Sequence, residues 1–165
     1  MNNTRRPLDP RICPVAIDAN ALDCDGSARD NLVDRLLGLS SAGTINLIVP
    51  KRVREEIQNA RTPPHVQEAA LTKLFTIPVG LNSDEQRRKR IIEQELQGNA
   101  RPGKHMADAD HLFEAVKYGG YFITHDRRIL TRAGRLGEIV PPSLTVVTLV
   151  DFLAIFDDYA ARDAK

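Results

Sequence analysis

Hydrophobic and polar residues follow two periods along the chain, one typical of strands and one typical of helices. Leu32 and Leu36 lie four positions apart behind Ser27, which has the side chain of a helix N-cap, and this spacing predicts an amphipathic helix. Four short apolar runs predict strands buried on both faces: residues 15–17, 44–49, 121–124 and 144–149. Strands that alternate with helices predict an α/β fold, a three-layer sandwich with a central, mainly parallel sheet.

The length and composition fit one globular domain. The chain has 165 residues, of which 42% are hydrophobic and 27% charged, enough to build a core without disulfides or structural zinc. No repeat or interior linker divides it, so we expect one domain over residues 14–165 behind an N-terminal tail over residues 1–13. A helix is expected from about residue 106 to residue 117, and only a turn of helix after His125.

Charge and cysteine content exclude several classes of protein. The net charge is +1, so any nucleic-acid-binding surface must be local. Cys13 and Cys24 are too few for a disulfide scaffold and have no CxxC spacing for zinc. No secretory signal and no apolar stretch of about 20 residues is present. We therefore expect a soluble, cytoplasmic protein that does not enter the membrane.

Two acidic residues follow predicted strands closely. Asp18 comes directly after residues 15–17, and Asp126 comes two residues after Thr124. In open α/β sheets, ligands bind beyond the carboxyl ends of the strands. Each acid is therefore a candidate site residue, although a solvated loop residue or a helix cap would occupy the same place.

Helix geometry selects two further acids. At about 100° per residue, Asp108 falls on the apolar stripe of its helix, whereas Asp110 falls about 200° away, on the predicted solvent face. The same count places Glu56 about 60° from the apolar Val53 and directs Glu55 outward. Asp108 and Glu56 are thus predicted to face inward.

Inward carboxylates need compensation, because a buried charge must be paired, hydrogen-bonded, protonated or bound to metal. Mg²⁺ and Mn²⁺ prefer oxygen ligands, and such a site can hold a phosphodiester and activate water. The alternative is structural, with Asp108 as a helix cap and Glu56 as an ion-pair partner.

Four segments, in order, resemble the motifs of the PIN domain family, in particular its VapC-type ribonuclease branch. In that family an Asp ends the first strand, often two residues before an Asn, and a Glu precedes an apolar residue on a helix. A later Asp opens a helix of DAxHLxxA type, and the last strand ends in T-x-D. The matching segments are VAIDAN (15–20), VPKRVREEI (49–57), ADADHLFEA (107–115) and FITHD (122–126).

The resemblance implies an endoribonuclease whose acids hold Mg²⁺ or Mn²⁺ and whose bound water attacks the phosphodiester without a side-chain nucleophile. The implied metal ligands and catalytic residues are Asp18, Glu56, Asp108 and Asp126, with Asn20 and Thr124 in support. It also implies a toxin paired with a small protein antitoxin, and a homodimer. Residues 62–105 exceed the length that a minimal toxin of this type needs, and are expected to form a helical clip or insert.

An RNA substrate requires positive charge near these acids. The selected candidates are Lys51, Arg52, Lys104 and Arg127. The run Arg87 to Arg90 is interleaved with glutamates on a predicted helix, which is typical of a solvated face. Aromatic residues make up only 5% of the chain, so phosphate contacts rather than base stacking are expected to dominate binding.

Other functions compete with the nuclease interpretation. A PIN-like binding module with weak or no catalysis would have the same fold. The segment LDCDGS at residues 22–27 imitates the DxDG[ST] signature of haloacid-dehalogenase-like phosphatases, but that chemistry needs its Asp at the end of a buried strand. Asp18 and Asn20 begin like an EF-hand loop, but the later ligands and the central Gly are missing.

Overall fold

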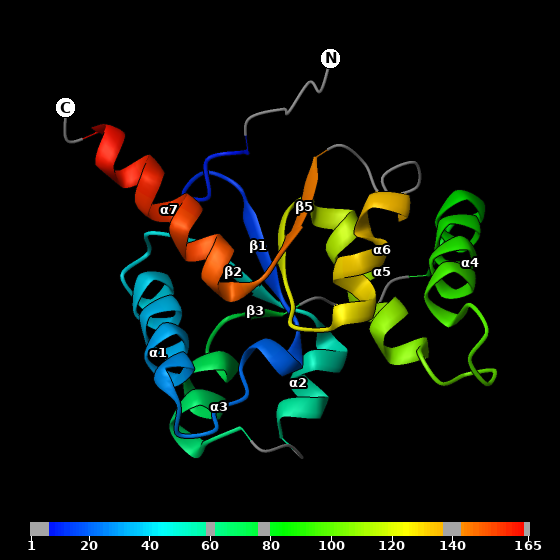
Figure 1. Ribbon diagram of the computed structural model, residues 1–165, viewed down its shortest axis with the longest axis horizontal. Helices are drawn as coiled ribbons and strands as arrows, with labels where there is room; N and C mark the ends of the chain where they lie inside the picture. Colours follow the sequence, from blue (N-terminus) through cyan, green and yellow to red (C-terminus); the bar gives the residue numbers. More distant parts are fainter. Residues whose placement is uncertain (1–6, 59–61, 76–79, 137–142, 164–165) are drawn as a thin grey trace.

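A parallel sheet forms the centre of the molecule. The computed structural model describes residues 7–58, 62–75, 80–136 and 143–163. Its described strands all run parallel, in the order β3-β2-β1-β4-β5 (Figure 1). They are β1 (Pro14–Ile17), β2 (Asn46–Val49), β3 (Leu74–Phe75), β4 (Gly120–Ile123) and β5 (Leu144–Val147).

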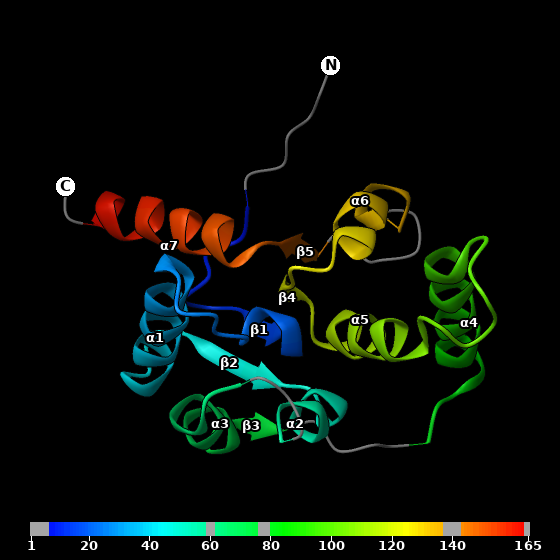
Figure 2. The same cartoon turned by 60° about the horizontal axis from the view of Figure 1, so that its bottom comes forward.

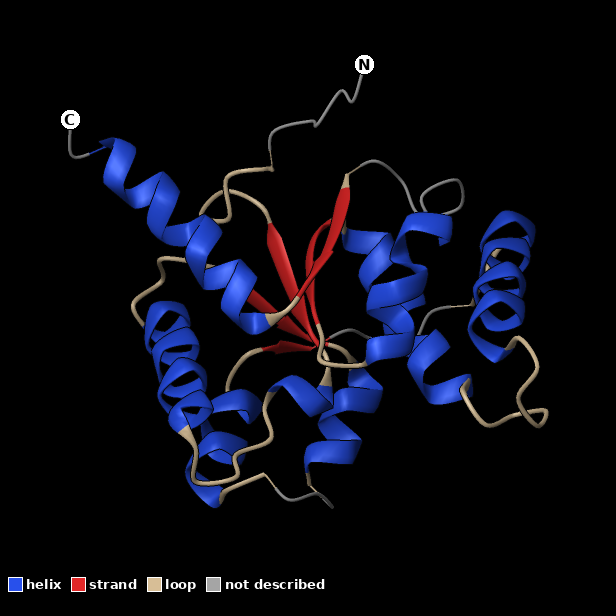
Figure 3. Cartoon of the chain, viewed as in Figure 1, coloured by secondary structure: helices blue, strands red, loops and turns tan. Residues whose placement is uncertain are grey.

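Helices cover both faces of this sheet (Figures 2 and 3). They are α1 (Ala28–Ser41), α2 (Lys51–Ile57), α3 (Pro64–Leu71), α4 (Ser83–Gln97), α5 (Met106–Tyr118), α6 (Arg127–Leu136) and α7 (Leu149–Asp163), with a short 3-10 turn η1 (Ala19–Ala21). The predicted α/β class is confirmed, and the arrangement agrees with a three-layer sandwich. None of the described helices is both long and apolar enough to cross a membrane.

Local sequence accounts for where two of the helices begin. The Ser27 hydroxyl accepts a hydrogen bond from the Arg29 amide, as expected of an N-cap. Before α4, Asn82 and Glu85 form a reciprocal capping box. Helix α6 runs to Leu136, well beyond the single turn expected after His125.

Strand β1 separates two hydrophobic cores. Val15 and Ile17 face the core formed with α1, α3 and α7, whereas Ala16 faces the core formed with α4, α5 and α6. Side chains alternate between the two faces of a strand, so a central parallel strand must be apolar at every position. This explains why β1 is apolar throughout and why the chain's first polar side chain after it, Asp18, marks its end.

The central strand is also the point where the order of strands reverses. Ala16 pairs with Ile48 of β2 on one side and with Phe122 of β4 on the other. Such a switch point opens a crevice at the carboxyl ends of the strands. The residues that follow β1 and β4 therefore lie at the position where a ligand would bind.

Strands β1 and β4 approach each other closely at Gly120. This residue has φ +75°, and a Cβ atom there would lie 2.0 Å from the carbonyl oxygen of Pro14. Only glycine fits both the backbone conformation and the available space.

The N-terminal tail and the expected clip both pack more closely on the rest of the domain than their sequences indicate. Residues 7–13 pack on the domain: Pro10 is buried, and the hydroxyls of Tyr121 and Tyr159 donate to the carbonyl oxygens of Leu8 and Pro7. Residues 1–6 of the predicted tail lie outside the described residues. Within segment 62–105, β3 extends the sheet and α3 packs against α1 and α2. Helix α4 is the part of this segment that packs on α5.

Candidate functional site

Asp18 is the centre of a hydrogen-bonded cluster at the end of β1. Its side chain is only 4% exposed. The hydroxyl of Thr124 donates to its Oδ2 at 2.6 Å, and the amide of Asn20 donates to the same atom at 2.8 Å. The ring Nδ1 of His111 lies 3.0 Å from its Oδ1. Both carboxylate oxygens are therefore held in fixed directions.

The two supporting residues also join the ends of β1 and β4. The side-chain oxygen of Asn20 accepts a hydrogen bond from the His125 amide at 2.8 Å. The Thr124 hydroxyl accepts one from the Asp126 amide at 3.0 Å. The structure thus places Asn20 and Thr124 against Asp18, the neighbourhood expected of them.

His111 bridges two of the candidate acids. It is 1% exposed, and its Nε2 lies 3.3 Å from Oε1 of Glu56 while Nδ1 faces Asp18. Burial alone would lower its pKa, but the hydrogen bond to Asp18 and the charges of Asp18, Glu56 and Asp108 outweigh burial and raise the pKa. The protonated form of His111 is therefore stabilised relative to that of a free imidazole.

His111 was not among the residues selected from the sequence. A signal for it existed, since it lies three positions after Asp108 and therefore on the same helical face. It also occupies the His of the DAxHLxxA pattern.

Glu56 and Asp108 reach the cluster from α2 and α5. Burial is the main cause that raises the pKa of Glu56, and the negative charges of Asp18 and Asp108 raise it further. Electrostatic attraction to His111 and Arg52 lowers this pKa in part. Asp108 lies in the first turn of α5, and its Oδ2 is 2.9 Å from Nδ1 of His105. The structure therefore brings Asp18, Glu56 and Asp108 within electrostatic reach of one another.

Asp126 lies at the neighbouring strand end and caps α6. Its Oδ1 accepts hydrogen bonds from the amides of Arg128 at 2.6 Å and Ile129 at 3.2 Å. This is the helix-cap role that the sequence left open for it. Its backbone amide is bound to Thr124, so the cap and the Asp18 cluster are parts of one network.

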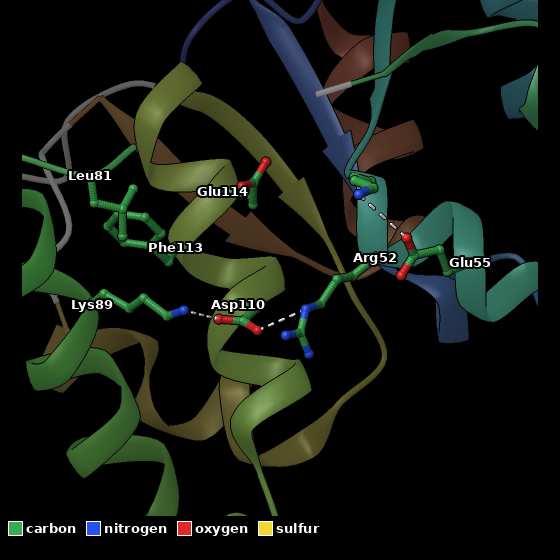
Figure 4. A pocket seen from close by; sticks show the side chains of 8 residues that line it. Arg52, Glu55, Leu81, Lys89, Asp110, Phe113 and Glu114 are labelled. Carbon is green, nitrogen blue, oxygen red and sulfur yellow. Dashed lines mark ion pairs between the residues drawn. The ribbon is translucent and has the colours of Figure 1, made fainter. Parts of the chain in front are cut away.

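The helical count is correct for α2 and wrong for α5. Glu56 is partly buried and Glu55 exposed, as predicted. Asp110, predicted to face solvent, is 7% exposed, because α4 packs against the outer face of α5. There the Asp110 carboxylate binds Arg52 Nε at 2.9 Å and Lys89 Nζ at 2.6 Å (Figure 4).

A pocket of about 400 Å³ lies around this ion-pair cluster. The apolar side chains of Leu81 and Phe113 form part of its wall, and Arg52 and Lys89 point toward Asp110 from opposite sides (Figure 4). Because both cations are paired there, the cluster mainly connects α2, α4 and α5.

The residues predicted to contact RNA do not form one group. Lys51 lies 3.7 Å from Glu55, and Arg52 is bound to Asp110. Lys104 and Arg127 are exposed, in the loop before α5 and at the start of α6. The phosphatase-like Asp23 and Asp25 lie in the loop between η1 and α1, several residues beyond the end of β1.

The acidic side chains of the cluster are of the chemical type that a hard cation prefers, but they do not form a complete coordination geometry. Among the described residues, no group of three His, Cys, Asp or Glu side chains is arranged as a complete metal-binding set. The clustered carboxylates of Asp18, Glu56 and Asp108 are nevertheless the oxygen ligands that Mg²⁺ and Mn²⁺ prefer. Burial, and to a smaller extent the charges of Asp18 and Asp108, raise the pKa of Glu56, and a bound divalent cation would offset these effects.

Comparisons with known proteins found no relative. No protein-family profile matches the chain, and searches of curated proteins and of solved structures likewise gave no match. The functional argument therefore rests on the site itself.

Proposed function

We propose that this chain is a PIN-like, metal-dependent ribonuclease that hydrolyses RNA phosphodiester bonds. The observation that carries the proposal is the convergence of Asp18, Glu56 and Asp108 at the switch point of a parallel sheet. These residues come from three separate segments and meet where α/β proteins bind ligands. Asp18 is buried, whereas Glu56 and Asp108 are partly exposed, so a cation bound there would offset the cost of burying the Asp18 carboxylate.

Asp18, Glu56, Asp108 and Asp126 are the residues that would hold Mg²⁺ or Mn²⁺. When bound, such a metal supplies an activated water and stabilises negative charge on the phosphate. Asp126 would contribute the oxygen that does not cap α6, since Oδ1 accepts both helix amides.

The remaining residues of the site fix the positions of these acids. Thr124 and Asn20 donate to one oxygen of Asp18 and so orient the carboxylate. His111 lies between Asp18 and Glu56, with one ring nitrogen facing each carboxylate. This arrangement preorganises charge before substrate arrives, which is the usual source of catalytic stabilisation.

The cysteine thiols do not supply a competing nucleophile. Burial, followed by the charge of Asp9, raises the pKa of Cys13 to about 11. Burial, then Asp30 and Asp34, also raises the pKa of Cys24. A thiol is reactive as the thiolate, so both side chains are poor nucleophiles at neutral pH.

A second candidate function is a PIN-like nucleic-acid-binding module without catalysis. The His111 bridge favours it, because His111 in its protonated form would offset the charge of Asp18 and Glu56 with no metal present. A toxin role with a protein antitoxin, and a homodimer, remain proposals that rest on the resemblance alone.

The deciding experiment is RNA cleavage by the purified protein with Mg²⁺ or Mn²⁺, with and without EDTA. We expect cleavage that EDTA, Asp108→Asn and Glu56→Gln each abolish. Glu55→Gln is the matched control, because it removes the same charge from an exposed neighbour and should leave cleavage unchanged. Cleavage that survives EDTA, or is lost equally in both Glu variants, would contradict the proposed site, and no cleavage of any RNA would favour the binding module.

A further inference from the structure

A strongly basic groove lies outside the acidic cluster, where the end of α4, the loop after it and helix α6 meet. Its volume is about 620 Å³. Four cationic side chains line it, together with a single acidic one: Lys104, Arg128, Arg132 and Arg135, with Glu95. The groove therefore carries a net positive charge.

One of these cations has a structural role. Arg128 Nη1 donates to the carbonyl oxygens of Leu96 at 2.8 Å and Gln97 at 3.3 Å, at the carboxyl end of α4. The Arg128 guanidinium at that position offsets the negative end of the α4 helix dipole and connects α6 to α4 through these hydrogen bonds. The cations left to bind a ligand are Lys104, Arg132 and Arg135.

The charge of these three residues is poorly compensated within the protein. Arg132 and Arg135 share the carboxylate of Glu95, at 3.8 Å and 4.0 Å, and the Arg135 side chain is 79% exposed. The side chains of Arg132 and Glu95 are only 25% and 29% exposed, but one carboxylate at these distances does not neutralise two guanidinium groups. Lys104 has no carboxylate partner anywhere in the described part of the chain.

The walls of the groove begin beside the proposed catalytic acids. Lys104 precedes His105, whose ring contacts Asp108, and Arg128 follows Asp126 by two residues. Two residues of the groove are therefore close in sequence to residues of the proposed catalytic site.

The lining chemistry favours a polyanion over a protein partner. Among the described residues that line the groove, only Ala100 has an apolar side chain, whereas protein interfaces bury apolar and aromatic anchors. We propose that this groove binds the backbone phosphates of single-stranded RNA, with Lys104, Arg132 and Arg135 as the contacts. The choice of RNA rests on the proposed ribonuclease function; the anionic ligand follows from the groove itself.

The test is equilibrium binding of a fluorescent single-stranded RNA oligonucleotide in EDTA, at several salt concentrations. The variant is Lys104→Gln with Arg132→Gln and Arg135→Gln. The charge-matched control is Arg87→Gln with Arg88→Gln and Arg90→Gln, all exposed residues of α4. Single-strand contacts contribute about 0.7 each to the slope of log K against log salt, so the variant should lose about 2 from that slope and bind roughly 100-fold more weakly at 0.1 M salt. The control should bind like the unsubstituted protein.

Several results would overturn the groove. The triple variant could bind RNA as tightly as the unsubstituted protein, or the control could lose as much RNA binding as the triple variant. The triple variant could also lose binding to a poly-glutamate peptide while it still binds RNA normally. If the triple variant does not fold, Lys104→Gln alone breaks no ion pair and should weaken RNA binding roughly 5-fold at 0.1 M salt.

Because binding is measured without metal, the groove and the catalytic proposal fail separately. Groove-dependent RNA binding by a protein that cleaves nothing supports the groove and overturns the ribonuclease. Metal-dependent cleavage by the unsubstituted protein, together with normal RNA binding by the triple variant, supports the ribonuclease and overturns the groove.

Discussion

His111 links the chemistry of the site to the energetics of the fold. A buried imidazole is ordinarily neutral, because desolvation disfavours its charge. Here three carboxylates reverse that preference and raise the pKa. A residue that the sequence did not single out thus connects two of the candidate acids, Asp18 and Glu56.

This reversal predicts a specific dependence of stability on pH. A histidine whose pKa is raised by folding stabilises the protein fully below its unfolded value, near 6.5, and that contribution is lost as pH rises through the folded pKa. In EDTA, the unsubstituted protein should exceed His111→Asn in free energy of unfolding at pH 5.5, and the excess should shrink above pH 7. Urea unfolding at each pH measures it.

The control is His65→Asn. His65 is exposed and lies 3.4 Å from Asp34, so its loss should cost less than about 1 kcal/mol. If the difference in free energy of unfolding between the unsubstituted protein and His111→Asn grew with pH, the imidazole would be neutral in the folded protein.

Asp126 has two roles that a pair of substitutions separates. Asn and Asp are comparable N-caps, whereas Ala costs about 1 kcal/mol at such a position. Asp126→Asn should therefore keep the stability of the protein and Asp126→Ala should lower it, while both abolish metal-dependent cleavage. Thermal unfolding and the RNA assay measure the two effects, and an active Asp126→Asn protein would restrict Asp126 to its cap.

At the scale of elements, Asp110 joins three helices. Its carboxylate receives Arg52 of α2 and Lys89 of α4 while it lies on α5. Hydrogen bonds to charged groups contribute about 1.5–3 kcal/mol when partly buried, so Asp110→Asn should destabilise the protein by about 2 kcal/mol. Glu55→Gln, which removes an exposed ion pair with Lys51, should cost less than about 1 kcal/mol. Equal losses in urea unfolding would show that burial adds nothing to the Asp110 cluster.

The contact between β1 and β4 predicts an unequal effect of two glycine substitutions. Gly120→Ala adds a Cβ against the Pro14 carbonyl and should cost about 2–5 kcal/mol, the sum of a left-handed backbone and a steric overlap. Gly43 has a similar φ of +70° with open space around it, so Gly43→Ala should cost only about 1–2 kcal/mol. Chemical denaturation gives both values, and similar costs would mean that β1 moves to admit the methyl group.

Sequence reasoning succeeded where a local pattern determines the structure. The apolar period placed β1 and α5, and the helical angle separated Glu56 from Glu55, because both depend on residues within one element. It failed at Asp110, whose surroundings are set by α4, and it missed His111, whose partners Asp18 and Glu56 come from other elements. The partners of Asp110 and His111 cannot be identified from the residues of α5 alone, although the spacing of His111 from Asp108 indicated which face of the helix it occupies.

For the whole molecule, the site lies across two halves. Asp18 and Glu56 come from the first half of the chain, and Asp108 and Asp126 from the second, on opposite sides of the switch point. A cation bound by all four would connect the halves and stabilise only the folded state.

This arrangement predicts the effect of metal on melting. At 100 times its Kd, a ligand adds about 2.7 kcal/mol, which for a domain of this size raises Tm by roughly 5–10 °C. Mn²⁺ should produce that increment in the unsubstituted protein and much less in Asp18→Asn. Asp34→Asn, at an exposed acid of α1, should retain it. Equal increments in the two variants would indicate that Mn²⁺ binds elsewhere.

The hydrogen bonds around Asp18 also determine when the site is assembled. Asp18 and His111 are 93 positions apart, and Asp18 and Thr124 are 106 apart. Closing loops of that length costs entropy that the packing of both cores offsets, so these contacts form only once both segments are present and packed. A ribosome that has made only the first hundred residues carries a chain with half of the acids and no site. Any activity of the acidic cluster therefore begins only after the second half has been synthesised and packed.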